Sequence, residues 1–312
     1  MKKFRTIFMG TPEFSVPCLE ALTECCEVIG VITQPDKPRG RGQRLQPSPV
    51  KVCAEKHGIP VYQPEKIKTE EFTTRLEEMK PDLIVVVAFG QILSQRILDI
   101  PEYGCINVHA SLLPRYRGAA PMQWCLINGE SKTGITTMFM DAGLDTGDML
   151  LKHEIEISDS MNLSELHDRM MTEGAKLLTQ TLKQLSEGTL IREKQEDSDS
   201  CYAPMLNKET GRIDWSKSAS EIHNLVRGLD SWPGAYTFRN GEKYKIWRTM
   251  VEDGTSVSPA GEILQADSHG LLVSTGNGLL RVLELQAPGG KRMPAGDYLR
   301  GHGIALPARF ED

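Results

Sequence analysis

No stretch of the sequence is apolar for long enough to cross a membrane, and the N-terminus lacks the apolar core of a secretory signal. A membrane helix needs about 18 consecutive apolar residues, and no segment here approaches that length. The short apolar stretch at 4–10 is interrupted by Arg5 and runs directly into Gly-Thr-Pro. Because both signals are missing, we predict a cytoplasmic protein.

Regularly spaced cysteines are also missing. The seven cysteines include no C-x-x-C pair and follow no regular framework. Disulfide-rich domains and structural zinc domains both carry such spacing. We therefore expect reduced thiols and no structural zinc.

The sequence has no excess of basic charge and no complete dinucleotide-binding fingerprint. Its formal net charge of −6 argues against a general nucleic-acid coat, although a local basic patch is compatible with it. In the fingerprint G-x-G-x-x-G, the glycines let the backbone approach a pyrophosphate. The segment MGTPEFSVP at 9–17 supplies only Gly10, so we do not expect a bound nicotinamide dinucleotide.

Buried strands alternate with helical segments through the first part of the chain. Segments rich in Val and Ile predict strands at 4–10, 27–33, 82–88 and 104–109. Helical spacing predicts helices at 16–26, 49–57, 70–80 and 91–98. This alternation predicts an α/β fold with a doubly wound, mostly parallel, Rossmann-like sheet. A hairpin at 133–141 and 148–157 and a long amphipathic helix at 162–188 follow it.

A second domain is indicated beyond a polar segment that lacks periodicity. The dipeptide Asn240-Gly241 is a strong hairpin signal, and glycine-rich turns separate further short strands. About five or six short strands predict a small OB-like β-barrel, although a small sandwich fits the periodicity nearly as well. The predicted division is a domain at 1–188, a linker at 189–206 and a domain at 207–312.

The segment TQPDKPRGRGQRLQPSPVK at 33–51 is strongly basic. Against Asp36 alone it carries Lys37, Arg39, Arg41, Arg44 and Lys51. Its prolines and glycines predict an exposed loop that is neither helix nor strand. Such a loop fits a phosphate backbone better than a membrane surface, and the alternative is a merely solvated run of charge.

Two polar residues, Asn107 and His109, end the hydrophobic segment CINVH at 105–109. Because they are two residues apart on a strand, their side chains share one face. They lie at the carboxyl end of the strand, where open α/β sheets bind their ligands. The pair is either a structural hydrogen-bonded pair or part of a binding site.

The turn after this strand could hold a planar ligand through backbone groups and apolar side chains. It consists of Ser111, Leu112, Leu113 and Pro114. The two arginines that follow, Arg115 and Arg117, suit a ligand carboxylate, an RNA phosphate or nearby backbone carbonyls. We assign them no role.

A second loop, DAGLDTGD at 141–148, carries Asp141, Asp145 and Asp148. Three acids in a loop could bind Mg²⁺ or Ca²⁺, but their spacing is not that of an EF-hand and the terminal Glu is missing. A carboxylate that orients His109 is the favoured interpretation.

These motifs together resemble the signature of the 10-formyltetrahydrofolate-dependent formyltransferases. The resemblance rests on VHASLLPRYRGAAP at 108–121 and GITTMFMDAGLDTGDML at 134–150. It extends over nearly the whole chain through five further segments: GTPEFSVPCL, the basic loop, RIDWSKSA, WPGAY and GKRMPAGDYLRG. It implies transfer of the formyl group of 10-formyltetrahydrofolate to an amine. The chain is most similar to members that formylate the free α-amino group of initiator methionyl-tRNA for translation initiation.

The resemblance implies three catalytic residues, Asn107, His109 and Asp145, which meet at the formyl carbon. The Asn107 amide and an imidazole N–H of His109 would donate to the oxyanion. Asp145 would orient His109 and help relay the amine proton. This chemistry needs no metal.

The resemblance also implies binding residues for both substrates. The folate would contact Ser111, Leu112, Leu113, Pro114, Phe89, Gly90, Gln91 and Ile92. Phe14 matches the family's contact to the methionine side chain, and Arg41 in the basic loop would contact the tRNA acceptor end. The second domain would bind tRNA, and we expect a monomer that has no membrane partner.

Three other functions stay open on the sequence. A formyltransferase for a small amine, such as glycinamide ribonucleotide or an amino-sugar nucleotide, would share the catalytic residues but would not need the basic loop or the second domain. A formyl-folate hydrolase would use the same residues with water as the nucleophile. A non-catalytic RNA-binding protein would need only the two domains.

Overall fold

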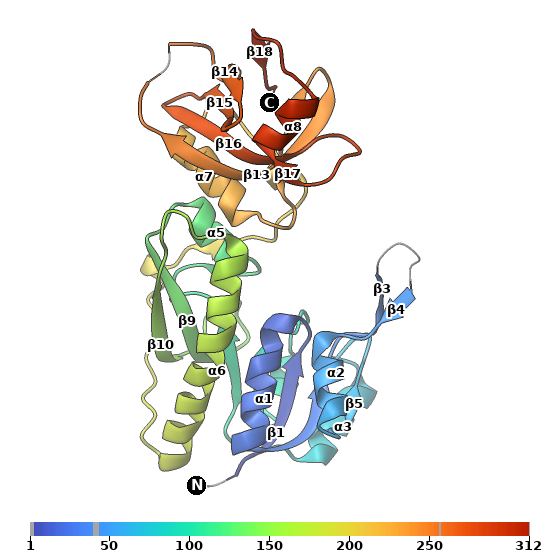
Figure 1. Cartoon of the computed structure of the whole chain (residues 1–312). Coiled ribbons are helices and arrows are strands. Elements are labelled where there is room, and N and C mark those ends of the chain that lie inside the picture. The colour runs from blue at the N-terminus through green and yellow to red at the C-terminus, as the bar shows by residue number, and fades with distance from the viewer. Residues whose placement is uncertain (1–2, 40–43, 256, 312) are drawn as a thin grey trace. The chain divides into compact units, whose positions relative to one another are not determined.

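The computed structural model describes residues 3–39, 44–255 and 257–311 (Figure 1). Its chain forms two compact units, each made of separate segments. The first unit comprises Met1–Gly118, Lys132–Glu156 and His167–Tyr202, and the second comprises Ala119–Ser131, Ile157–Leu166 and Ala203–Asp312. Within the described residues, no helix is both long and apolar enough to span a membrane.

The first unit contains the predicted parallel sheet. Its strand order is β10-β9-β7-β6-β1-β2-β5. Five strands pair in parallel: β1 (Arg5–Gly10), β2 (Glu27–Ile32), β5 (Val61–Tyr62), β6 (Leu83–Val87) and β7 (Cys105–His109). The antiparallel hairpin of β9 (Lys132–Phe139) and β10 (Met149–Glu156) extends one edge beside β7. The predicted α/β class and mostly parallel sheet are therefore confirmed.

Helices follow the strands as the periodicity predicts. They are α1 (Val16–Cys25), α2 (Pro49–Lys56), α3 (Glu70–Met79), α4 (Gln95–Leu98) and the long α6 (Leu163–Glu187). Local signals fix several starts: Ser48 Oγ accepts from Lys51 N–H at 3.0 Å before α2, and Thr69 caps α3 in the same way. All five residues of β6 are buried, as its continuous apolar sequence requires.

The second unit is an antiparallel sheet that returns to its starting strand. The order is β12-β13-β16-β15-β14-β18, and β17 pairs with β16. Beyond β18, Glu311 forms an antiparallel bridge to Phe238 of β12, with N–H···O distances of 3.2 and 2.8 Å. The predicted OB-like domain is thus present as a curled sheet whose two ends meet.

The strands of this sheet are β12 (Ala235–Arg239), β13 (Glu242–Glu252), β14 (Glu262–Asp267), β15 (Gly270–Ser274), β16 (Leu279–Gln286), β17 (Met293–Pro294) and β18 (Ala308–Arg309). The hairpin signal at Asn240-Gly241 is confirmed, because both residues have positive φ and join β12 to β13. Helices α5 (Pro121–Ile127), α7 (Ala219–Gly228) and α8 (Ala295–Gly301) belong to the same unit. Trp215 stacks on Phe310 in its core, with ring centroids 5.4 Å apart.

Two local predictions are wrong. The basic segment is not devoid of strand, since β3 (Lys37–Arg39) pairs with β4 (Arg44–Gln46). A two-stranded ribbon has free edges, so it tolerates Pro38. The helix predicted at 91–98 is confined to α4, because the backbone of Ser94, the residue before it, is extended.

Candidate active site

Three neighbouring parallel strands bring the predicted site segments to one edge of the first unit's sheet. Strands β1, β6 and β7 end at Gly10, Val87 and His109, and their carboxyl ends lie side by side. Hydrogen bonds join the first two of the loops that follow: Ser15 Oγ donates to Val87 O at 2.6 Å, and Thr11 Oγ1 donates to Phe89 O at 3.1 Å. This is the edge at which open α/β sheets bind ligands.

His109 is buried at the end of β7 and has two different neighbours. Its Nε2 lies 3.0 Å from the carbonyl oxygen of Tyr116, which can only accept, so Nε2 carries the proton. Its Nδ1 lies 3.7 Å from Oδ2 of Asp145, which is beyond a direct hydrogen bond. The nitrogen left for chemistry is therefore Nδ1.

Asp145 is held in place by backbone groups. It has a φ of +55°, in the left-handed region that side chains other than glycine rarely adopt. Its Oδ2 accepts from the N–H of Gly118 at 2.9 Å, and its side chain is only 16% exposed. The Asp145 carboxylate thus lies close to Nδ1 of His109 without a direct hydrogen bond, and its predicted role in orienting His109 stays a prediction.

Asn107 lies two residues before His109, on the same face of β7. Its backbone is fixed between Val86 of β6 and Met138 of β9. The residue is partly buried, and its side-chain amide makes no hydrogen bond within the described part of the chain. Both amide hydrogens are therefore available to a ligand.

Two residues without a role predicted from the sequence hold the Asp145 loop. Gln195 Nε2 donates at 2.8 Å to the carbonyl oxygens of both Asp145 and Gly147. Arg117 in turn donates from Nε to Gln195 Oε1 at 3.0 Å and from Nη1 to Asp197 at 2.9 Å. Gln195 lies about 50 residues from the loop it supports, in the segment expected to be a linker, so no local pattern could identify it.

The turn after β7 is anchored to β9. Thr136 Oγ1 donates to Ser111 O at 2.7 Å and accepts from Leu113 N–H at 3.1 Å. The Ser111 hydroxyl donates to Arg115 O at 2.6 Å, so it closes the turn. Leu113 is buried, whereas Leu112 and Pro114 are partly exposed. Those two side chains and the backbone of the turn are what a ligand could reach.

The loop after β6 divides into buried and exposed residues. The Phe89 side chain is 2% exposed and belongs to the core, and Gln91 is bound to the backbone at Ile67 and Pro64. Gly90 is exposed with a φ of +83°, and Ile92 is 83% exposed. Gly90 and Ile92 are the members of this predicted folate-binding set that present free surface.

The residues predicted to contact the acceptor substrate are less fully placed. Phe14, in the loop after β1, is buried, and its ring packs against that of His167 at a centroid distance of 5.5 Å. Arg41 lies outside the described residues. Of the other basic side chains of that segment, Lys37 and Arg44 are exposed on β3 and β4, and Lys51 is paired with Asp36 at 2.8 Å.

Asp141, another acid of the 141–148 loop, stabilises the conformation of the loop. Asp141 Oδ1 accepts from Gly143 N–H at 3.0 Å and from Thr146 Oγ1 at 2.7 Å. Among the described residues, the loop's acids do not form a group with converging ligand atoms. Asp145 is the one that faces His109.

Comparison with known proteins identifies related chains over nearly the full length. The formyl transferase family model matches residues 3–182, and the model for the formyl transferase C-terminal domain matches residues 205–303. A methionyl-tRNA formyltransferase of Citrifermentans bemidjiense is 55% identical over 97% of this chain and 95% of its own. One from Geobacter metallireducens is 56% identical over 95% and 94%.

Solved structures support the same fold. The sugar 3N-formyl transferase WlaRD, determined in the presence of dTDP and 5-N-formyl-THF, matches 90% of this chain and 98% of its own with a TM-score of 0.68 at 19% identity. That identity establishes the fold alone. With both family models and the full-length relatives in agreement, the chain belongs to the formyl transferase family.

Proposed function

We propose that this enzyme transfers the formyl group of 10-formyltetrahydrofolate to the α-amino group of methionyl-tRNA, giving N-formylmethionyl-tRNA. The observation that carries the proposal is identity above 50% to methionyl-tRNA formyltransferases over both units. The arrangement of Asn107, His109 and Asp145 at the edge of the sheet supports it chemically. An α-amino group has a pKa of about 7.7–8.0, so part of it is neutral and nucleophilic near pH 7.

Asn107 stabilises the oxyanion that forms when the amine attacks the formyl carbon. The residue is partly buried, its backbone is held on a strand, and its amide is not engaged by other described groups, so the N–H groups are free to donate to that oxyanion. An oxyanion donor typically lowers the barrier by about 3–4 kcal/mol.

His109 and Asp145 move the proton. Because Nε2 is committed to Tyr116, Nδ1 accepts the proton that the attacking nitrogen releases. Asp145 stabilises the resulting imidazolium from 3.7 Å. Nδ1–H then donates to the oxyanion and finally to N10 of the folate as the C–N10 bond breaks. One C–N bond forms and one breaks, and the proton passes from amine to tetrahydrofolate without net release.

The formyl donor lies against the two loops that flank His109. The backbone of the turn at 111–114 and the side chains of Leu112 and Pro114 contact its ring system, and the exposed Gly90 and Ile92 cover it from the loop after β6. Gly134 of β9 leaves room for the neighbouring strand and for the turn, because a Cβ there would clash with His153 O and would lie 2.6 Å from Leu112 Cδ2. Four further members of the predicted set support these two loops through buried side chains or hydrogen bonds: Ser111, Leu113, Phe89 and Gln91.

The tRNA contacts basic side chains in both units. In the first unit these are Lys37 and Arg44 of the β3–β4 ribbon, with Arg41 between them in sequence. Phe14 contacts the methionine side chain. Such cationic contacts to phosphate are largely blind to sequence and depend on salt.

In the second unit, β13 carries Lys243, Lys245 and Trp247 on the face opposite its buried residues, and the buried Tyr236 of the neighbouring β12 lies beside Lys243. Lys243 Nζ lies 3.2 Å from the ring centroid of Tyr236, and Lys245 Nζ lies 5.2 Å from that of Trp247. Burial, and then the charge of Lys245, lower the pKa of the Lys243 ammonium. A phosphate would relieve the repulsion between the two lysines, so this basic face of β13 is a tRNA contact.

A transfer assay separates this function from the alternatives. The enzyme is incubated with 10-formyltetrahydrofolate labelled in the formyl group and, in turn, methionyl-tRNA, uncharged tRNA, glycinamide ribonucleotide and an amino-sugar nucleotide. We expect label on methionyl-tRNA alone. Transfer to a small amine in its place would overturn the proposal, and label released as formate in every reaction would indicate a hydrolase.

A further inference from the structure

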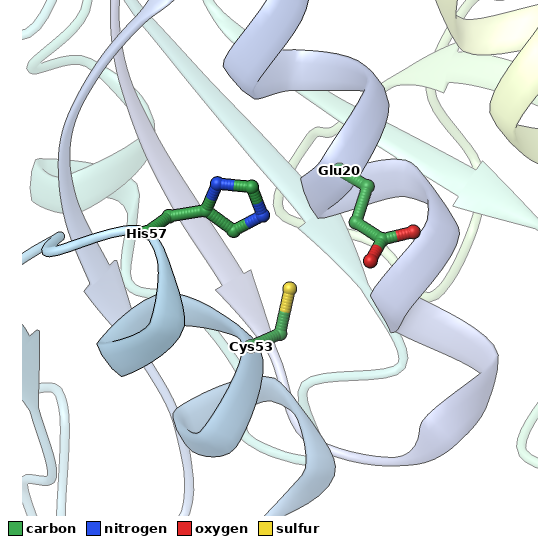
Figure 2. A group of neighbouring side chains, drawn as sticks. All are labelled: Glu20, Cys53 and His57. Atoms are coloured by element: carbon green, nitrogen blue, oxygen red, sulfur yellow. The ribbon is translucent and has the colours of Figure 1, made fainter.

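Three side chains with metal-ligand chemistry meet between α1 and α2, outside the proposed reaction centre (Figure 2). Glu20 comes from α1, Cys53 lies on α2, and His57 follows directly at the end of α2. One carboxylate oxygen, the Sγ atom and one imidazole nitrogen all lie within 4.8 Å of one another. It is the only such group found among the described residues.

The helical fold of this segment produces the grouping. Cys53 and His57 are four residues apart, so both point from the same face of α2, and the N–H of His57 still donates to Cys53 O at 3.2 Å. Packing of α1 against α2 brings Glu20 to that face. Chain folding alone therefore assembles one oxygen, one sulfur and one nitrogen ligand.

None of the three side chains is engaged elsewhere in the described structure. No hydrogen bond or ion pair is made by the Glu20 carboxylate, the Cys53 thiol or the His57 ring. Cys53 is 7% exposed, whereas Glu20 and His57 lie at the surface. The ligand atoms thus keep their lone pairs for an ion that solvent can deliver.

The surroundings of the Cys53 thiol disfavour the thiolate while no cation is bound. Burial, and then the negative charge of Glu20, raise the pKa of Cys53, and Lys56 only partly opposes this. A thiol in that state is a poor nucleophile. A bound divalent cation reverses the effect, because it favours the thiolate and neutralises the carboxylate.

We propose that Glu20, Cys53 and His57 bind one thiophilic divalent cation, of which Zn²⁺ is the representative, with water as the fourth ligand. Thiolate, imidazole and carboxylate bind Zn²⁺ at about 2.0–2.3 Å, so the ligand atoms need to close by roughly 1 Å. The surface side chains of Glu20 and His57 can make that movement. On binding, the Cys53 S–H bond breaks, the sulfur binds the metal and the proton passes to buffer.

The cation would join two segments that lead from proposed substrate contacts. Helix α1 follows the loop that carries Phe14, and α2 follows the basic β3–β4 ribbon. A ligand that binds only the folded state stabilises it. The cation therefore stabilises the pairing of α1 with α2 without entering the formyl-transfer chemistry.

Cobalt titration of the full chain tests the site. The protein is freed of metal, kept reduced with a phosphine, and titrated with Co²⁺ alone. We expect a thiolate-to-cobalt charge-transfer band that saturates at one ion per chain and disappears when Zn²⁺ is added. Cys53→Ser should abolish the band, and Glu20→Gln and His57→Ala should each weaken binding at least about tenfold.

Matched substitutions control for general effects. Glu24→Gln changes a second exposed acid of α1, and His269→Ala removes an exposed imidazole in the second unit, so neither should alter the titration. Because Glu20 and His57 are at the surface, their variants should keep the fold even if Cys53→Ser does not. No band in the wild-type chain, or unchanged binding in any one of the three ligand variants, overturns the site.

Discussion

Asn107 is the residue on which the proposed chemistry depends most directly, because its amide has no other partner in the described structure. We predict that Asn107→Ala lowers kcat by about two to three orders of magnitude, the typical effect of losing an oxyanion donor. KM for both substrates should change little. The measurement is steady-state formylation of methionyl-tRNA, with the thermal transition recorded to verify folding.

A matched amide in the second unit provides the control for this substitution. Asn207 is exposed and bonds only to Thr210, so Asn207→Ala should keep wild-type kcat. Near-normal turnover in a well-folded Asn107→Ala enzyme would rule out the oxyanion role.

Gln195 acts on the reaction only through the loop it supports. The isosteric change Gln195→Glu keeps a partner for Arg117 but replaces the donors to Asp145 O and Gly147 O with an oxygen. Leaving such buried acceptors unsatisfied costs about 1–3 kcal/mol, so we predict a fall in kcat of roughly tenfold to a hundredfold. KM for the folate should stay near its wild-type value.

The pH profile distinguishes positioning from a loss of stability. If Gln195 positions Asp145 against His109, then Gln195→Glu should shift the pH dependence of kcat, whereas general destabilisation would not. Gln180, on the exposed face of α6, makes no side-chain hydrogen bond in the described structure. Gln180→Glu should therefore change neither kcat nor its pH dependence. A Gln195→Glu enzyme with unchanged kcat and pH profile would refute the positioning role.

The three proposed catalytic residues were identified through the resemblance to the formyltransferase family, whose two motifs are each local in the sequence. Asn107 and His109 are two residues apart on a strand, and Asp145 lies in a glycine-broken loop. Which nitrogen of His109 faces Asp145 could not be predicted. That depends on the carbonyl of Tyr116, whose direction is fixed only by the folded turn. The assigned roles of the three residues stay predictions until variants are measured.

At the scale of elements, the turn after β7 depends on a single hydroxyl of β9. Thr136→Val keeps the shape of the side chain but leaves Ser111 O and Leu113 N–H without their partner. We predict a loss of about 1–3 kcal/mol of unfolding free energy. KM for 10-formyltetrahydrofolate should rise as well, because the turn is its proposed support.

The next residue of the same strand separates these two effects. Thr137 is equally buried, but its hydroxyl bonds to Thr181 Oγ1 at 2.8 Å on the other face of the sheet. Thr137→Val should therefore destabilise the chain without changing KM for the folate. The KM for 10-formyltetrahydrofolate is compared under conditions in which both variants are folded to the same extent. Equal values would show that the turn does not hold the formyl donor.

Elements were predictable where one local pattern decides them and not where distant partners do. Buried Val and Ile runs identified β6 and β7, and Asn240-Gly241 identified the β12–β13 hairpin. The β3–β4 ribbon escaped prediction because its strands have three residues each and include Pro38. The predicted helix at 91–98 begins only after the extended Ser94, and the Gln91 side chain instead contacts Ile67, a distant partner that periodicity does not contain.

At the scale of the whole molecule, the two units interleave along the chain. The segments 119–131 and 157–166 belong to the second unit although they lie within the sequence of the first. Arg227 Nη1, for example, donates to Ser158 O at 2.8 Å and to Met161 O at 3.2 Å. Domain boundaries placed at residues 188 and 206 do not predict such contacts, because changes of composition along the sequence carry no information on which distant segments pair. The assignment of one function to each domain stays a prediction.

The basic face of β13 gives the prediction that concerns the whole enzyme and its tRNA. We predict that the double variant Lys243→Ala/Lys245→Ala raises KM for methionyl-tRNA about tenfold, equivalent to about 1.4 kcal/mol, and leaves kcat nearly unchanged. Each lost phosphate contact should also reduce the slope of log affinity against log salt by about 0.7–0.9. Arg292 should not replace the lysines, because Asp230 and Glu284 already pair with it.

The control for this double variant removes the same charge from the first unit. Lys66→Ala/Lys68→Ala changes two exposed lysines before α3, which have no place in the proposed tRNA contacts. If net charge alone governed association, both double variants would weaken tRNA binding equally and flatten the salt dependence alike. If only the Lys243/Lys245 double variant weakens tRNA binding, and folate binding is unchanged, tRNA recognition is assigned to this face. The reason is that a phosphate contact is local, whereas net charge acts on the whole surface.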